Sequence, residues 1–190
     1  MTVANNHLWL KEYFDRYQKS IFNSDIYDPF IDIKNIWQKA SETGRKVIFA
    51  GNGGSAAMAS HCSVDLTKAA GIRAINFNEA DLITCFANDY GYEDWVSMAL
   101  QFYGDEGDCL VLVSSSGSSL NMVQAAKKAK ELGISVVTFT GFEKNNKLKQ
   151  MGEVNLWVDS KAYNIVEMTH HIWILSIVDL IVGNAEYTPS

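Results

Sequence analysis

Proline and cysteine are scarce in this 190-residue sequence, which contains two prolines and three cysteines. The cysteines are Cys62, Cys85 and Cys109, an odd number without the spacing of a CxxC motif. This pattern excludes a disulfide framework as the basis of the fold. Each cysteine lies in a segment that we expect to be a buried helix or strand. All three are therefore predicted to be reduced core thiols, as is typical of the cytosol.

Positive charge is also scarce. The formal net charge is -6, and the longest basic cluster is KKAKE at residues 127–131. A polyanion would meet no attractive field, so nucleic acid is not an expected ligand. Lys11, Glu12 and Asp15 interrupt the N-terminal apolar positions, and no segment approaches the roughly 20 apolar residues that span a bilayer. The sequence therefore predicts a cytoplasmic protein with neither a signal peptide nor a membrane partner.

Apolar residues are abundant instead, at 47% of the chain, which suffices for the core of one domain. Helical spacing predicts two helices, at residues 5–21 and 28–44, before the first strand. Short continuous apolar runs then alternate with helical segments, which favours a parallel α/β sheet covered on both faces. The five predicted strands are residues 46–50, 72–78, 109–114, 135–140 and 154–159.

Further helices are predicted between and after these strands, at residues 56–70, as a pair within 80–104, and at 120–133. The segment 120–133 alternates an apolar face with a lysine-rich one and ends on a glycine, as a surface helix does. The chain closes with IVEMTHHIWILSIVDLIVG, residues 165–183, a strongly apolar helix. We expect this helix to be buried in the core or against another subunit.

Two loops at predicted strand–helix junctions are candidates for ligand binding: GNGGS at residues 51–55 and SSSGSS at residues 114–119. In an open parallel sheet, free N–H groups and the positive ends of helix dipoles meet at such junctions. Glycine allows a ligand to approach closely, and hydroxyl groups donate hydrogen bonds to phosphate oxygens. Neither loop contains Lys or Arg, so N–H groups, hydroxyls and helix dipoles would hold a phosphate.

Two alternatives stay open for these loops. Glycine and serine also form plain tight turns. In addition, Gly51, Gly53 and Ala56 satisfy the dinucleotide fingerprint G-x-G-x-x-G/A, with Glu79 after the next strand as a ribose-binding carboxylate. Because the fingerprint leaves the serine-rich loop without a role, we rank it below phosphosugar binding.

Four motifs, in this order, resemble the sugar isomerase (SIS) domain family and, within it, the phosphoheptose isomerases, which interconvert sedoheptulose 7-phosphate and a heptose 7-phosphate. The motifs are GNGGSAAMASHCSVDL, CFANDYGYEDWVSMAL, GDCLVLVSSSGSSLNMVQAAKKAKELG and VVTFTG. The resemblance runs from about Lys46 to Val182. It implies a three-layer α/β/α sandwich around a five-stranded parallel sheet. The chain, 1–190, would be one SIS domain with an N-terminal helical extension, 1–45, and an α/β core, 46–183.

The resemblance also implies a homotetramer with active sites at subunit interfaces, and a place in heptose synthesis for lipopolysaccharide or capsule. Matched motif by motif, it implies substrate contacts from Asn52, Gly53, Gly54, Ser55, Asn88 and Asp89. It implies that the phosphate is held by Ser114, Ser115, Ser116 and Ser119.

His61 matches a zinc-ligand histidine of the family, and Asp65 stands where the family usually has a glutamate that is both metal ligand and catalytic base. Four residues apart on a helix, the two side chains share one face. Aspartate is shorter by one methylene, whereas a base must come within about 2.6–3.2 Å of its proton. Without the resemblance, the pair is more typical of a surface or interface His–Asp pair, and this alternative stays open.

The final helix departs from the family pattern, which is Gln, then His three residues on, then a second His five beyond. Aligned on the DLI at residues 179–181, these positions are Glu167, His170 and Leu175. Glu167 would replace the glutamine as an oxygen ligand. Leu175 does not replace the histidine that acts as ligand and general acid.

An alignment shifted by one residue would instead place Val166 and Ile174 at the glutamine and second histidine positions, and the site would lose most of its ligands. His171 adds an imidazole that the family pattern does not demand. Two interpretations of His171 stay open: it compensates for the lost histidine, or it is an ordinary interface residue.

The sequence thus predicts an aldose–ketose isomerisation of a sugar phosphate through an enediolate. The resemblance assigns Asp65 as the base, His61, Asp65 and Glu167 as ligands of a divalent metal, and His170 or His171 as the acid. A cation stabilises enediolate charge, and His/carboxylate ligation favours zinc, although ligand type alone leaves iron, manganese and nickel open. The alternatives are a non-catalytic SIS module that binds a phosphosugar or a protein, and an isomerase of another sugar phosphate.

Overall fold

The computed structural model describes residues 3–22 and 24–186, and these contain seven α-helices and one short 3-10 helix, η1. The helices are α1 (Val3–Ile21), η1 (Ser24–Ile26), α2 (Tyr27–Glu42), α3 (Gly54–Lys68), α4 (Ala80–Tyr90), α5 (Trp95–Tyr103), α6 (Leu120–Glu131) and α7 (Tyr163–Val182). Every predicted α-helix is present, with ends that differ by a few residues. The pair predicted within 80–104 is α4 and α5.

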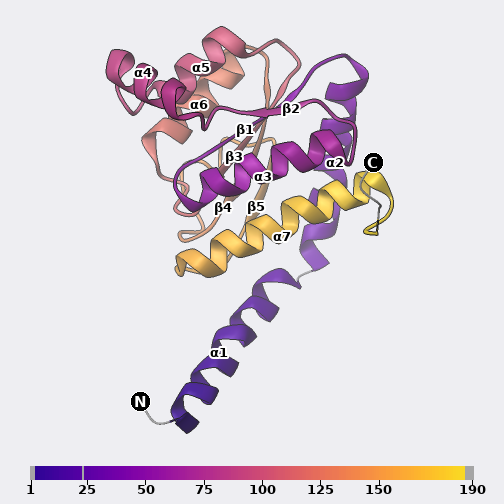
Figure 1. Ribbon diagram of the computed structural model, residues 1–190, viewed down its shortest axis with the longest axis vertical. Coiled ribbons are helices and arrows are strands. Elements are labelled where there is room, and N and C mark those ends of the chain that lie inside the picture. Colours follow the sequence, from indigo (N-terminus) through magenta and orange to yellow (C-terminus); the bar gives the residue numbers. More distant parts are fainter. Residues whose placement is uncertain (1–2, 23, 187–190) are drawn as a thin grey trace.

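Five strands form one sheet in the order β2-β1-β3-β4-β5, and all neighbouring strands are parallel (Figure 1). The strands are β1 (Val47–Gly51), β2 (Ala74–Asn76), β3 (Cys109–Ser114), β4 (Ser135–Thr140) and β5 (Val154–Trp157). The bounds of β3 and β4 are those predicted, whereas the edge strands β2 and β5 are shorter. An edge strand pairs on one side only, so its apolar run extends beyond its paired residues.

Alternate residues of the strands face opposite helical layers. Val47 and Val111 belong to one core cluster with α2, α3 and α7, whereas Ile48 and Leu110 belong to a second cluster with α5 and α6. Helix α4 packs at the margin of the second cluster. The predicted three-layer α/β/α sandwich is therefore confirmed (Figure 1).

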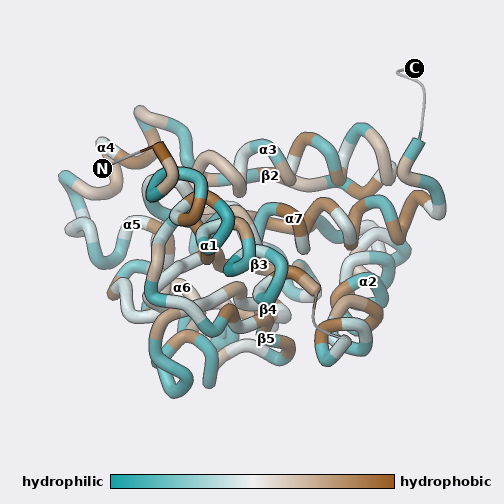
Figure 2. Tube along the Cα trace, turned by 90° about the horizontal axis from the view of Figure 1, so that it is seen from below, coloured by the Kyte–Doolittle hydropathy of each residue, from teal (hydrophilic) through white to brown (hydrophobic). Residues whose placement is uncertain are grey.

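Helix α7 is buried on one face only. Val166 and Trp173 pack into the core, while Met168, Ile172 and Leu180 are exposed, so hydrophobic residues occur along its whole length (Figure 2). By length and composition α7 is apolar enough to cross a membrane, so the prediction that no segment approaches this was wrong. The core helices of soluble proteins pass the same test, and α7 packs here against α2, α3 and β4.

The cysteines differ in burial. Cys62 and Cys109 are buried, as predicted, and burial raises the pKa of both thiols, that of Cys62 to about 12. Cys85 is exposed, so its predicted burial was wrong. It lies on α4, which has no buried residue because this helix packs only at the margin of the second core cluster.

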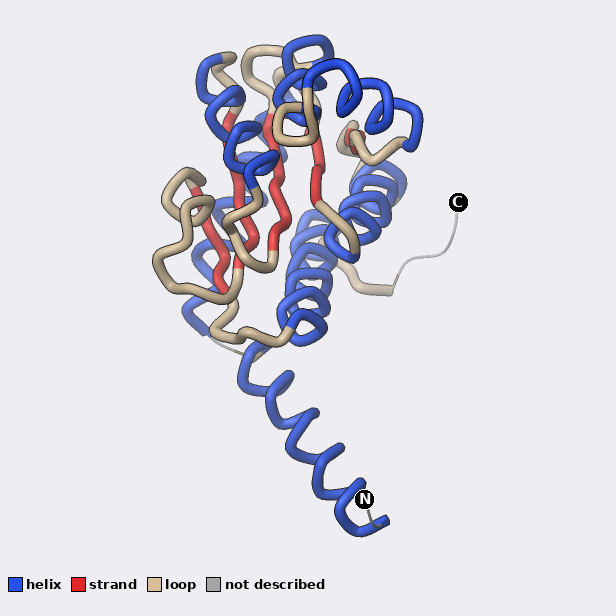
Figure 3. The backbone as a smooth tube through the Cα atoms, turned by 90° about the vertical axis from the view of Figure 1, so that its left-hand side faces the viewer, coloured by secondary structure: helices blue, strands red, loops and turns tan. Residues whose placement is uncertain are grey.

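Helix α1 projects away from the sandwich as an arm (Figure 3). None of its residues is buried, and it is tied to the body by few bonds, one of them from the Tyr17 hydroxyl to the Asn164 carbonyl at 3.0 Å. Its exposed large apolar side chains are Val3, Leu8, Trp9, Leu10 and Phe14. Such a row of exposed apolar side chains is typical of a surface that packs on another molecule.

A buried ion pair joins the amino ends of the two central strands. Lys46 Nζ lies 2.6 Å from Asp108 Oδ2 and 2.7 Å from Asp105 Oδ2. The Asp108 side chain is 0% exposed and also accepts the backbone N–H groups of Lys46 and Asp105. The hydrogen bond from Lys46 lowers the pKa of the exposed Asp105 carboxyl. Asp108 therefore fixes the starts of β1 and β3 relative to each other.

We expect Asp108→Asn to lower the free energy of unfolding by about 3–5 kcal/mol, because it leaves a buried ammonium without its buried counter-charge. Urea unfolding followed by circular dichroism measures this loss. Asp105→Asn is the matched control, and its loss should be much smaller because the Asp105 carboxylate is largely exposed. Equal losses in the two variants would contradict the role given to Asp108.

Candidate functional site

The glycine loop, residues 51–55, joins β1 to α3 at the carboxyl edge of the sheet. Gly53 has a φ of 57°, which favours glycine. Gly51 has no room for a side chain, because a Cβ there would lie 2.7 Å from the backbone carbonyl of Ser55. Gly54 begins α3, and within the described part of the chain its N–H makes no backbone hydrogen bond. The N–H groups of Ser55 and Ala56 donate to carbonyls of the loop, so Gly54 offers the free N–H at this helix N-terminus, a feature on which anions bind.

The serine loop, residues 114–119, joins β3 to α6 beside the glycine loop. Ser114 Oγ accepts the N–H of Gly117 at 3.2 Å. Gly117 has a φ of 60°, and a side chain there would collide with Asn146. Ser119 precedes α6 without making a capping hydrogen bond. Its hydroxyl is therefore available to a ligand at a second helix N-terminus.

The two loops and α7 line one cavity of about 200 Å³. The lining residues are Asn52, Ser55, Val113, Ser114, Ser115, Ser116, Ser119, Tyr163 and Glu167. Ser115 is 6% exposed, and its hydroxyl has no well-formed hydrogen bond within the described ranges, although it lies close enough to the Glu167 carboxylate to offset part of the rise that burial causes in the pKa of that group. A ligand oxygen at this point would give the Ser115 hydroxyl a full hydrogen-bond partner. The hydroxyls and the size of the cavity suit a phosphate group.

Glu167 enters this cavity from α7 and lies against the first residue of α3. A side chain at Gly54 would collide with the Glu167 carboxylate, which shows how close the two are. Burial raises the pKa of Glu167. A helix N-terminus favours the carboxylate, but a second anion beside it is unfavourable. A phosphate in this cavity would therefore need a proton or a cation next to Glu167.

A second polar cluster consists of His61 and Asp65 on α3 and His171 on α7, two helices that lie side by side (Figure 1). His61 Nε2 is 3.1 Å from Asp65 Oδ2, and His61 Nδ1 is 2.9 Å from His171 Nε2. Burial and the charge of His61 lower the pKa of His171. His61 and Asp65, which the i, i+4 spacing places on one helical face, are thus joined by His171 as a third group. The cluster is not part of the cavity lining.

His170 points the other way. It is 0% exposed, and its Nε2 lies 2.9 Å from the Thr140 carbonyl, to which it donates. Burial lowers the pKa of His170 to about 4, so the ring is neutral at pH 7. Of the two adjacent histidines, His171 contacts a predicted site residue and His170 does not.

The other positions considered on α7 lie outside the cavity. Val166 and Ile174 are 0% exposed and belong to the core, and Leu175 packs against the same core from a partly buried position. Glu167 is the α7 residue, together with Tyr163, that lines the cavity.

Asn88 and Asp89 do not lie beside the glycine loop or the serine loop. Both are exposed near the end of α4, where Asn88 Nδ2 donates to Asp89 Oδ1 at 2.9 Å. Neither residue lines the cavity. A substrate contact from these residues needs an extended ligand or a second chain.

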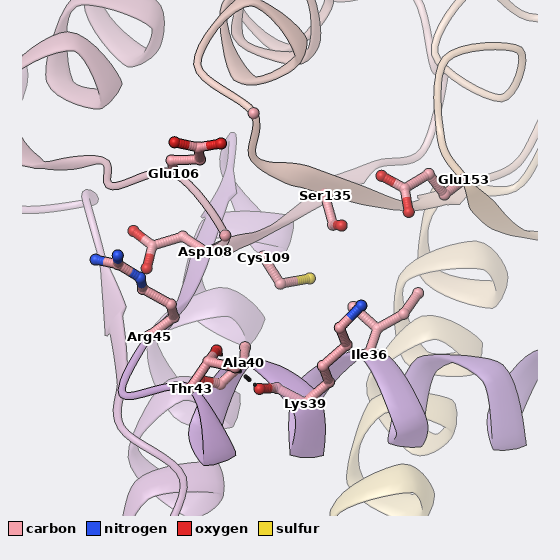
Figure 4. A pocket seen from close by; sticks show the side chains of 12 residues that line it. Ile36, Lys39, Ala40, Thr43, Arg45, Glu106, Asp108, Cys109, Ser135 and Glu153 are labelled. Carbon is pink, nitrogen blue, oxygen red and sulfur yellow. Dashed lines mark hydrogen bonds between the residues drawn. The ribbon is translucent and has the colours of Figure 1, made fainter.

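A larger cavity, of about 510 Å³, lies at the amino edge of the sheet (Figure 4). Lys39 and Arg45 line it together with Glu106 and Glu153, around the buried Cys109. These charges of both signs give no preference for an anion. Among the described residues, no helix begins at this edge with a glycine or serine loop, so the smaller cavity at the carboxyl edge is the better candidate site.

A metal ion does not fit one chain alone. Within residues 3–22 and 24–186, no group of three His, Cys, Asp or Glu side chains is placed to hold a metal. His61 and Asp65 offer two donors on one helical face, whereas Glu167 lies in the phosphate cavity. A complete ligand set therefore requires donors from elsewhere.

The parallel sheet, the two loops at helix N-termini and the hydroxyl-lined cavity define an α/β domain of the phosphate-binding class. The family model for the SIS domain matches residues 21–141, and the chain belongs to this family. The chain is 34% identical over 189 residues to phosphoheptose isomerase of Buchnera aphidicola subsp. Acyrthosiphon pisum (strain Tuc7), covering 87% of this chain and 96% of that protein.

Phosphoheptose isomerase of Mycobacterium tuberculosis (strain CDC 1551 / Oshkosh) is 36% identical over 141 residues, which cover 70% of this chain and 71% of that protein. The structure of phosphoheptose isomerase GmhA from Neisseria gonorrhoeae superposes with a TM-score of 0.84 at 26% identity, over 94% of this chain and 98% of that chain. The similarity to phosphoheptose isomerases therefore extends over nearly the whole domain.

Three residues near the cavity escaped the sequence analysis. Tyr163 lines it, Asn121 is hydrogen-bonded to Asn52, and the Tyr92 hydroxyl donates to Asn52 as well. Asn121 lies two residues after the serine loop, and this position was the one available signal. Nothing in the spacing of Tyr92 or Tyr163 marks them, because each reaches the site only through the packing of separate segments.

Because His170 is buried and neutral, we expect stability to fall as the pH drops from 6.5 to 4. In that window the unfolded chain binds a proton that the folded chain does not, which removes up to about 3 kcal/mol. His170→Gln retains a donor for Thr140 but does not titrate, so its urea midpoint should vary less between pH 7 and 4. The control, His7→Gln at an exposed position, should follow the parent protein. Parallel pH profiles for all three proteins would contradict this role.

Proposed function

We propose that the protein is an aldose–ketose isomerase of a sugar phosphate, acting on sedoheptulose 7-phosphate. The observation that carries this proposal is the cavity between two helix N-termini, which the hydroxyl-bearing residues of the serine loop line. The relatives named phosphoheptose isomerase supply the substrate and the reaction. Phosphate would be bound by the serine loop and by the free N–H of Gly54 at the N-terminus of α3.

The proposed chemistry has a base and an acid at the end of the substrate away from the phosphate. The phosphate and the carbonyl lie at opposite ends of a seven-carbon chain, so the base need not adjoin the phosphate cavity. Asp65 would take the proton from the carbon beside the carbonyl, giving an enediolate. His171 would give a proton to the neighbouring carbon as the hydroxyl proton moves between the two substrate oxygens, and proton exchange with solvent would restore Asp65 and His171. His61 contacts both groups.

Within this proposal His171, and not His170, is the acid. His171 is in contact with His61, whereas His170 is buried on the Thr140 carbonyl. His171 thus takes the role that the histidine replaced by Leu175 has in the family. This is the compensation that the sequence left open.

A divalent metal, zinc, is proposed as the cofactor, with His61, Asp65 and Glu167 as ligands. Both ring nitrogens of His61 contact protein groups in this chain, so His61 would have to give up one of these contacts to bind the metal. When bound, it would supply positive charge for the enediolate oxygens. Since one chain does not assemble three ligands, the proposal requires a site shared between chains. The exposed apolar side chains of α1 favour an assembly of this kind, and we propose a homotetramer. The proposed setting is the cytoplasm, in heptose synthesis for lipopolysaccharide or capsule.

The competing function is a non-catalytic SIS module that binds a phosphosugar. It is favoured by one observation, the lack of a three-ligand metal group within the described part of the chain. The two functions differ in turnover, since a binding module would bind sedoheptulose 7-phosphate saturably without converting it. An isomerase of a different sugar phosphate would convert that sugar instead.

We expect Asp65→Asn to reduce turnover of sedoheptulose 7-phosphate by about 10²–10⁴-fold, because an amide does not accept the proton. Binding of the substrate, measured by calorimetry, should change little. Asp28→Asn, on the exposed first turn of α2, is the control and should retain full activity. Unchanged turnover in Asp65→Asn would remove this residue from the mechanism. Saturable binding without turnover in the parent protein would favour the binding module.

We expect Glu167→Ala to lose bound zinc and zinc-dependent turnover, whereas Glu167→Gln retains an oxygen donor and part of both. Metal content after dialysis against zinc, measured by mass spectrometry, is the first readout. Turnover with and without added zinc is the second. Full zinc content in Glu167→Ala would exclude Glu167 as a ligand.

A further inference from the structure

A reciprocal pair of amides ties the glycine loop to the serine loop. Asn52 Nδ2 donates to Asn121 Oδ1 at 3.0 Å, and Asn121 Nδ2 donates to Asn52 Oδ1 at 2.8 Å. Asn52 lies in the glycine loop and lines the cavity, whereas Asn121 is in the first turn of α6 and is 2% exposed. The two loops are thus joined side chain to side chain, in addition to the pairing of β1 with β3.

The orientation of both amides follows from a backbone group. The N–H of Met122, shared with the Ser119 carbonyl, donates to one side-chain atom of Asn121 at 3.1 Å, so that atom must be the oxygen. The nitrogen of Asn121 then faces Asn52, whose facing atom must in turn be Oδ1. Turning both amides over would set two N–H donors against each other at Met122.

Tyr92 adds a second donor to the same oxygen. Its hydroxyl lies 3.1 Å from Asn52 Oδ1 and donates to it. Oδ1 of Asn52 therefore accepts two hydrogen bonds from protein groups, whereas Nδ2 gives only one of its two hydrogens to Asn121. The second hydrogen of Nδ2 has no partner in the described part of the chain. Asn52 is left able to donate to a ligand, with its acceptor oxygen already engaged.

We infer that Asn121 is a positioning residue that holds Asn52 as a hydrogen-bond donor toward the bound sugar phosphate. Asn52 would then recognise an oxygen of the ligand that accepts, such as a carbonyl, a hydroxyl lone pair or a phosphate oxygen. The inference rests on the proposed function for the identity of the ligand. The mutual orientation of the two loops does not depend on it.

The test uses Asn121→Asp, which keeps the shape and the oxygen that faces Met122 but replaces the nitrogen with an oxygen. At pH 7.5 this oxygen opposes Oδ1 of Asn52, so one of the two hydrogen bonds that hold the Asn52 amide is replaced by a repulsion between two oxygens. We expect sedoheptulose 7-phosphate to bind at least about tenfold more weakly by calorimetry, which corresponds to about 1.4 kcal/mol. Asn155→Asp, at a partly buried amide between β4 and β5, is the matched control and should bind normally.

A double-mutant cycle separates positioning from a direct role. If Asn121 acts through Asn52, then Asn121→Asp should add no further loss of affinity in an Asn52→Ala background. If the fold-losses of affinity in the two single variants multiply in the double variant, the inference is overturned. Normal binding by Asn121→Asp would overturn it as well. Should the aspartate variant fail to fold, Asn121→Ser removes the same hydrogen bond without a buried charge and takes its place in the cycle.

The same experiments distinguish a failure of the proposed function from a failure of the role given to Asn121. If the parent protein does not bind sedoheptulose 7-phosphate, that function is wrong, and hydrogen exchange of residues 51–55 then decides on Asn121 alone. Exchange that is at least about tenfold faster in Asn121→Asp than in the parent, with the Asn155→Asp control unchanged, would support the positioning role. Equal exchange in parent and variant would overturn it.

Discussion

Burial of the sheet on both faces is the constraint on which the rest of the structure depends. Every residue of β1 and β3 is buried, so the polar groups that adjoin these two strands lie at their ends. At the amino edge, Lys46 and Asp108 neutralise each other and hold the strands in register. At the carboxyl edge, the same strands end in loops whose backbone N–H groups and hydroxyls remain available. The strand ends that the ion pair holds together thus lie opposite the strand ends whose polar groups are free to bind a ligand.

Phosphate recognition at this edge would use no cationic side chain. The cavity contains serine hydroxyls and two helix N-termini, and its one ionisable side chain besides Tyr163 is the carboxylate of Glu167. Partial positive charges at helix ends are fixed in direction and need no side-chain ordering, which suits a small ligand. Glu167 works against a second anion unless a proton or a cation accompanies it. Its charge state and phosphate binding are therefore coupled.

Local pattern and family motifs predicted the fold and much of the site. Short runs rich in β-branched and apolar residues predicted the bounds of β3 and β4 to the residue, because strands buried on both faces carry no alternation of polar and apolar positions. The i, i+4 spacing placed His61 beside Asp65, since both lie on one helix. Contacts between helices were not predictable in this way. His170 and His171 are adjacent, so they point about 100° apart on α7, and only the packing of that helix decides which of them meets His61.

Met122 contributes to the site through its backbone alone. Its N–H sets the direction of the Asn121 amide, and that direction passes to Asn52. The buried Met122 side chain packs in the second core cluster and takes no part in these hydrogen bonds. Replacement of that side chain by leucine or isoleucine would leave the backbone N–H in place, so the orientation of the Asn121 amide tolerates other apolar residues at position 122. Proline is the one residue that would remove this hydrogen-bond donor, since it lacks the backbone N–H. The direction of the Asn52–Asn121 amide pair is thus set by a main-chain donor that does not depend on the side chain at position 122.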